Sequence, residues 1–204
     1  MPTVITLFVF SLGYAISRYL LLGDVALTQL PVFIANKAIA LFALLLLFTS
    51  SLAHQRGQKI NARRLGHGAW HAGLVHLGLS LAILSPAYYD KFFDQQQLSL
   101  AGELLVLFGV LASYLFWRLS EAPSHRLIWL KLALYSLLAG HLLPMGGSWL
   151  NPSLWPGGLP PISLLAFALL LGTVMVTSRT LLQNRAADGS NSYLSCATER
   201  PETS

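Results

Sequence analysis

Six stretches of mostly apolar residues divide this chain of 204 residues and determine what it can fold into. They lie at about 4–22, 32–53, 65–85, 99–118, 127–143 and 161–181. A helix needs about 20 such residues to cross the hydrocarbon core of a bilayer, which is roughly 30 Å thick. The sequence therefore predicts an all-α fold, an integral membrane bundle of about six transmembrane helices.

The charge content excludes an ordinary water-soluble domain. Only 10% of the residues are charged and 54% are hydrophobic, whereas a soluble domain has roughly 25% charged residues. The excess apolar surface must face lipid, so the bilayer is the first expected partner. The net charge is +5, but the basic residues sit at the ends of the stretches, which argues against a nucleic-acid partner.

The connecting segments predict how the bundle is oriented. Segment 54–64 carries four Lys and Arg residues and no acid, and segment 118–131 carries three against one acid. The connections on the other side have an excess of acid or no charge. The positive-inside rule then places both termini in the cytoplasm. We expect a membrane domain over residues 1–183 and a disordered cytoplasmic tail over the polar residues 184–204.

The histidines are the ionisable residues of most interest, because such groups inside hydrocarbon are often functional. His54 and His125 lie in the basic connections, where solvated side chains are expected. His67 and His71 are four residues apart near the cytoplasmic end of the third stretch. That spacing puts them on one helix face and could suit a metal, but no third ligand is evident.

His76 and His141 lie deeper in the predicted membrane. They are about 11 residues into the third stretch and about 14 into the fifth, or roughly 16 and 21 Å at 1.5 Å per residue. The two helices run in the same direction, so the two depths match within about one turn. Two such imidazoles could ligate one haem from both sides. The alternative is that each histidine hydrogen-bonds across a helix contact, in a small transporter or a structural helix bundle.

Other residues could belong to the same site. Gly73 and further small residues share the face of His76, which leaves room for a porphyrin edge or for a close helix contact. Arg18 and Lys37 lie in the outer third of the first two stretches, and Glu103 lies at the outer end of the fourth. Their side chains either extend to the membrane interface or form an ion pair or a contact with a haem propionate.

Several short motifs resemble one family. Arg63-Arg64-Leu65-Gly66, followed ten residues after the glycine by His76, resembles the third helix of the ferric-reductase-like transmembrane domain. Four other runs resemble its bacterial members: ANKA at 35–38, PAYYDKFF at 86–93, LAGEL at 100–104 and PPISLL at 160–165. The likeness covers about residues 35–180. Ferric reductases, NADPH oxidases and the haem-binding membrane subunit of the bacterial periplasmic methionine sulfoxide reductase system share this domain.

The resemblance implies a cofactor and its ligands. The family uses histidines on its third and fifth helices as axial ligands of haem b, and His76 and His141 match one such pair. Members often carry a second histidine about 13 residues upstream on the fifth helix, where this chain has Ile128. The corresponding positions before His76 are Ala62 and Arg63. The resemblance therefore implies one haem b.

The resemblance also implies an electron-transfer role. The expected protein is a membrane oxidoreductase subunit, in a bacterial inner membrane, that carries single electrons. The sequence has no G-x-G-x-x-G motif for a nicotinamide or flavin nucleotide. We therefore expect a separate electron donor, a flavoprotein or a quinol, whose redox group is a flavin or a quinone, and an acceptor on the outer side.

Overall fold

The computed structural model describes residues 2–23, 30–121 and 127–198. It is almost entirely helical, with α1 at Pro2–Ile16, α2 at Leu30–Gln55, α3 at Lys59–Ala82, α4 at Pro86–Tyr89, α5 at Leu100–Glu121, α6 at Leu127–Leu142 and α7 at Ile162–Thr198. A π-helical turn, Ser17–Leu21, continues α1. Each of the six apolar stretches coincides with one long helix, so the predicted all-α fold is confirmed.

Four of these segments are long and apolar enough to cross a membrane within the described residues. They are Pro2–Leu21, Pro31–Gln55, Leu100–Leu119 and Pro156–Gln183. Helix α3 together with the bent segment Pro86–Phe92 would be a fifth. Helix α6 has 16 residues, which corresponds to about 24 Å and is shorter than the roughly 30 Å hydrocarbon core. The structure therefore supports an integral membrane protein.

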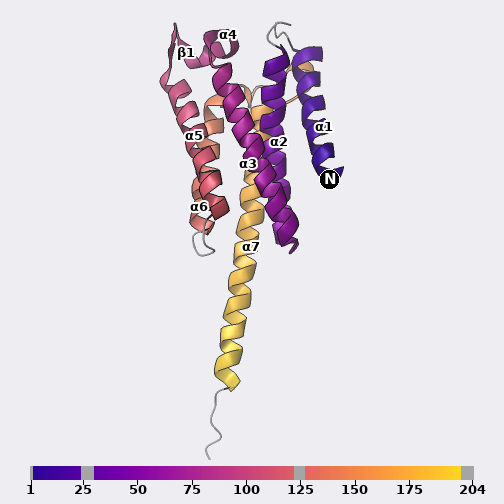
Figure 1. The fold of residues 1–204 in the computed structure, drawn as a ribbon, viewed down its shortest axis with the longest axis vertical. Helices are drawn as coiled ribbons and strands as arrows, with labels where there is room; N and C mark the ends of the chain where they lie inside the picture. Colours follow the sequence, from indigo (N-terminus) through magenta and orange to yellow (C-terminus); the bar gives the residue numbers. More distant parts are fainter. Residues whose placement is uncertain (1, 24–29, 122–126, 199–204) are drawn as a thin grey trace, which may run out of the picture.

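The long helices form a bundle in which α2 packs against α1, α3 and α7, while α5 packs against α6 (Figure 1). Only a short turn at Gly57 separates α2 from α3. Gly57 has φ +75°, a left-handed conformation that glycine adopts without strain. This turn makes α2 and α3 antiparallel and keeps them in contact along their length.

Irregular structure gathers at one end of the bundle, which we call the upper end as in Figure 1. The chain bends by 114° between α3 and α4, and the hairpin of β1 (Phe93–Asp94) and β2 (Gln97–Leu98) follows. Three 3-10 turns between α6 and α7, at 143–148, 152–154 and 156–158, lie at the same end. We call the opposite end, where α2 meets α3, the lower end.

The core contains two groups of buried apolar residues. The larger includes Leu46, Ala69, Leu134 and Leu170 and joins α2, α3, α6 and α7. The smaller includes Ala15, Leu41 and Ile162 and attaches α1 to α2 and α7. Large apolar side chains such as Val9, Leu107 and Trp129 point outward instead. Such exposure is expected where a helix faces lipid.

Two helices extend beyond the apolar stretches that the sequence delimits. Most of the basic segment 54–64 is helical, because α3 already begins at Lys59, and Arg63 and Arg64 are exposed on its first turns. Helix α7 continues to Thr198, and the disordered tail expected over residues 184–204 stays a prediction. Residues 184–198 contain no proline, so no missing N–H group interrupts the helix there. Residues 24–29, 122–126 with His125, and 199–204 lie outside the described residues.

Candidate functional site

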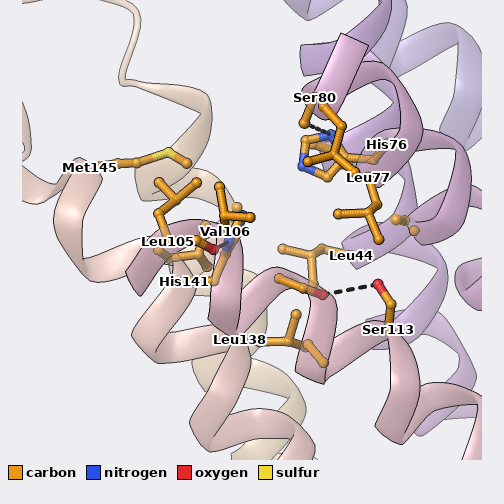
Figure 2. Close-up of a pocket in the computed structure, with 18 of the residues that line it drawn as sticks. Leu44, His76, Leu77, Ser80, Leu105, Val106, Ser113, Leu138, His141 and Met145 are labelled. Atoms are coloured by element: carbon orange, nitrogen blue, oxygen red, sulfur yellow. Dashed lines mark hydrogen bonds between the residues drawn. The ribbon is translucent and has the colours of Figure 1, made fainter. Parts of the chain in front are cut away.

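The structure brings the rings of His76 and His141 together. Their centroids are 6.3 Å apart and their planes are inclined by 84°. His76 comes from α3 and His141 from α6, and they approach one cavity from opposite sides (Figure 2). His76 lies six residues before the end of α3, and His141 lies one residue before the end of α6. The pair therefore lies close to the upper end of the bundle.

A buried amide orients the ring of His76. Its Nδ1 lies 2.6 Å from Oδ1 of Asn36 on α2, a residue with 0% of its surface exposed. The Ser80 hydroxyl donates to the same oxygen over 3.1 Å. Because an amide oxygen can only accept, Nδ1 carries the proton and donates. The other ring nitrogen, Nε2, then keeps its lone pair for a ligand.

A backbone carbonyl orients the ring of His141. Its Nδ1 donates to the carbonyl oxygen of Leu105 on α5 over 2.8 Å. One turn further along α5 is Gly109, where an added Cβ would lie 3.2 Å from that same Nδ1. The missing side chain at Gly109 allows α5 to approach closely enough for the bond. His141 is thus held in the same tautomer as His76, with Nε2 unprotonated.

The two free nitrogens are suited to a shared metal. In the part of the chain that the structure describes, all hydrogen bonds of both rings involve Nδ1. Imidazole nitrogen binds a first-row metal at about 2.0–2.1 Å and lies about 1.1 Å from its ring centroid, so two in-line bonds place the centroids about 6.2–6.4 Å apart. The observed 6.3 Å fits this value. Edge-to-face contact alone also occurs at about 4.5–7 Å, so the centroid distance is compatible with both arrangements, and the two Nε2 atoms without a hydrogen bond favour a ligand.

Two adjoining cavities, of about 130 and 220 Å³, share both histidine rings. The first has an almost entirely apolar lining with many small residues, including Ala43, Ala69, Gly73, Gly109 and Ala112. At Gly73, which the sequence singled out, an added Cβ would meet no atom within 4 Å. The second cavity reaches the upper end and is lined by aromatic and charged side chains, among them Tyr19, Phe33, Tyr88, Asp90 and Lys91. An apolar space with one polar end fits a macrocycle that carries carboxylates on one edge.

Lys37 supplies a positive charge beside the pair. It lines both cavities, and its Nζ lies 5.1 Å from the ring centroid of Phe33 and 5.0 Å from that of Tyr89. No carboxylate among the described residues pairs with it. An ammonium group in a membrane protein normally has a partner, and a bound carboxylate would be one.

Arg18 has a different environment from the one expected for a cofactor-binding residue. Its guanidinium group donates to the carbonyl oxygen of Leu159, and it lines neither cavity. Nearby, the hydroxyl of Tyr14 donates to the carbonyl oxygen of Pro160 over 2.7 Å. In this structure Arg18 therefore connects the end of the first helix to the segment before α7, and it does not reach the histidine pair.

The remaining described histidines are not gathered into a site. His54 is exposed in the last turn of α2. His71 is exposed on α3, and its ring lies 4.6 Å from that of Trp70. Within the described residues there is no group of three or more His, Cys, Asp or Glu side chains that could hold a metal ion. Among the described residues, His67 and His71 belong to no such group.

Sequence reasoning missed the residues that orient the two rings. Asn36 is an isolated amide in an apolar stretch, and its cost of burial could have indicated a role. The carbonyl group of Leu105 has no sequence signal, since every residue has one. No protein-family model matches this chain, and no curated protein has significant sequence similarity to it. The geometry of the histidine pair is therefore the basis for assigning a function.

Proposed function

We propose that this protein binds one haem b between His76 and His141 and transfers single electrons in the membrane, as a ferric-reductase-like transmembrane protein. The observation that carries the proposal is the pair of imidazoles 6.3 Å apart, each with Nδ1 hydrogen-bonded and Nε2 free. This is the tautomer that haem ligation through Nε2 requires, and bis-histidine ligation is common in electron-transfer haems.

The residues of the site would divide the work of holding the cofactor. A bound haem supplies one-electron redox chemistry at its iron. Asn36 and the Leu105 carbonyl keep the protons on Nδ1 and fix the direction of both rings. The apolar lining of the first cavity would exclude water from the macrocycle. Lys37, which lines both cavities, would pair with a propionate.

The proposed topology has six spans with both termini in the cytoplasm, and a bacterial inner membrane is the proposed location. The exposed Arg63 and Arg64 at the lower end support this orientation. The upper end would then face outward, and the acceptor would meet the haem there. A flavoprotein or a quinol, with a flavin or a quinone as its redox group, is the proposed electron donor.

A non-redox membrane protein, either a small transporter or a structural bundle, is the second candidate. One observation favours it: each histidine already makes a hydrogen bond to a neighbouring helix, His76 to α2 and His141 to α5. Such bonds alone can explain a histidine within a helix bundle. They leave the Nε2 atoms of two histidines that line a cavity without a hydrogen bond, and this candidate offers no function for them.

An absorption spectrum separates the two candidates. The protein is purified in mild detergent from cells supplied with a haem precursor, and spectra are recorded before and after addition of dithionite. Bis-histidine haem gives a sharp Soret band that shifts on reduction. Colourless protein that also fails to bind added haemin would refute the haem proposal and favour the second candidate.

A further inference from the structure

Asn36 is the point at which three separate elements meet. It lies on α2 with 0% of its surface exposed. Its Oδ1 accepts from His76 and Ser80 of α3, and its Nδ2 donates to the hydroxyl of Tyr89 in α4 over 2.8 Å. A buried amide is costly unless its polar atoms are paired. Here both ends of the amide are paired, and one of them holds the proposed haem ligand.

The direction of this amide determines whether His76 can be a ligand. With Oδ1 toward the ring, as in this structure, the ring proton stays on Nδ1 and Nε2 stays unprotonated. With the amide reversed, its NH₂ group would donate to Nδ1 and move the ring proton to Nε2. A protonated Nε2 cannot bind iron. In this structure the Tyr89 hydroxyl accepts from Nδ2.

We propose that Asn36 is a positioning residue that selects the ligating tautomer of His76 and sets the reduction potential of the haem. This inference rests on the proposed function. An acceptor at Nδ1 gives the imidazole partial negative charge and makes Nε2 a stronger donor to iron. A stronger donor favours the ferric state and lowers the potential. The bond to Tyr89 polarises the amide and strengthens the acceptor, so α4 at the upper end is coupled to the ligand.

Of the two hydrogen-bond acceptors that orient the histidine rings, only that of Asn36 is a side-chain atom, so a substitution can change it directly. His141 is held by a backbone carbonyl, which every side-chain variant of Leu105 retains. Asn36→Asp offers acceptors only, whereas Asn36→Leu offers none. Thr49→Val is the matched control, because Thr49 lies on the same helix, donates only to Leu45 of that helix and lines neither cavity.

The test is a redox titration of the haem-loaded full chain, combined with haemin binding to the haem-free chain. We expect Asn36→Asp to lower the potential and Asn36→Leu to raise it. The leucine variant should also bind haemin about 10–100-fold more weakly, the usual cost of losing such a partner of a metal ligand. Thr49→Val should behave as wild type. The carboxylate of Asn36→Asp would lower the potential through its charge alone, so the shifts in Asn36→Leu and Tyr89→Phe, which add no charge, distinguish a positioning role from a packing role.

Tyr89→Phe provides a second test that depends little on folding. It keeps the ring beside Lys37 and removes the acceptor of the Asn36 amide. The expected result is a rise in potential that is smaller than in Asn36→Leu. Wild-type potentials in haem-loaded Asn36→Asp and Tyr89→Phe would overturn the role of Asn36 and leave the haem site in place. Wild-type protein without haem would instead overturn the proposed function, and this role with it.

Discussion

Helix α6 carries two polar rings with opposite surroundings. His141, at its upper end, borders both cavities and has a free Nε2. Tyr135, six residues earlier and about 9 Å lower, is only 6% exposed and belongs to the main core cluster. Its hydroxyl lies 3.3 Å from Oγ1 of Thr177 on α7. In the upper half of the bundle, His141 thus offers a ligand and borders unfilled space, whereas in the lower half Tyr135 is packed and its hydroxyl has a partner.

The same contrast appears between α2 and α3. In the upper half, Asn36 and His76 meet beside the cavities. In the lower half, the hydroxyl of Ser50 donates to the carbonyl oxygen of Ala62 over 2.7 Å, and Ala62 is 7% exposed. The two helices are in close contact there, at one of the positions where the family resemblance would place a second ligand. A cofactor site needs both an available ligand atom and unfilled volume, whereas among the described residues Ser50 and Ala62 are paired with each other and Ala62 is buried.

The number of haems bound per chain depends most strongly on the contrast between the upper and the lower half. We expect one haem per chain, because the described residues contain one pair of facing imidazoles with free nitrogens. A pyridine haemochrome assay on haem-replete protein of known concentration measures the ratio. Two haems per chain would mean that His67, His71 or His125 also serves as a ligand, and the contrast between the halves would fail.

Filling the lower part of the cavity should abolish most binding. Gly73→Phe places a ring in the space where an added Cβ meets no atom within 4 Å, so haem should be displaced while the helices still pack. We expect haem content to fall at least about tenfold, equivalent to about 1.4 kcal/mol. Gly78→Phe is the control, since Gly78 on the same helix is exposed, has equally open space and lines neither cavity. Equal haem content in the two variants would show that the cavity is not the haem site.

Removing the charge of Lys37 should have a moderate effect. In Lys37→Met a haem propionate loses its cation, and we expect haemin to bind about tenfold more weakly, since a charged hydrogen bond contributes about 1.5–3 kcal/mol. The potential should also fall, because a nearby cation favours the reduced haem, which has one more negative charge. Lys37→Arg keeps the charge and should remain close to wild type. Haemin titration and redox titration of both variants check this, and identical values for Met and Arg would exclude a propionate contact.

Substitution of Tyr135 should affect haem binding least. Tyr135→Phe removes one hydrogen bond in the lower half, and such bonds between membrane helices average about 0.6 kcal/mol. We expect a slightly lower thermal unfolding midpoint and an unchanged Soret spectrum. A spectrum altered as strongly as in Gly73→Phe would contradict the separation of the two halves.

The sequence predicted how deep a residue lies along its helix better than it predicted which residues it contacts. Residue counts placed His76 and His141 at similar depths, because α3 and α6 run in the same direction at a fixed rise per residue. The helices are apolar on most faces, so the sequence could not indicate how each one is rotated. For this reason the bond between Asn36 and His76, the carbonyl partner of His141 and the attachment of Arg18 to Leu159 emerged only in three dimensions.

The most direct test of the central claim is the reduced-minus-oxidised absorption spectrum of His76→Ala and His141→Ala at equal expression. Each substitution removes one proposed axial ligand, so we predict loss of haem or a shifted, broadened Soret band in both variants. His54→Ala and His71→Ala are the controls, because both histidines are exposed and line neither cavity, and their spectra should match wild type. A normal spectrum in either His76→Ala or His141→Ala would contradict the bis-histidine haem site.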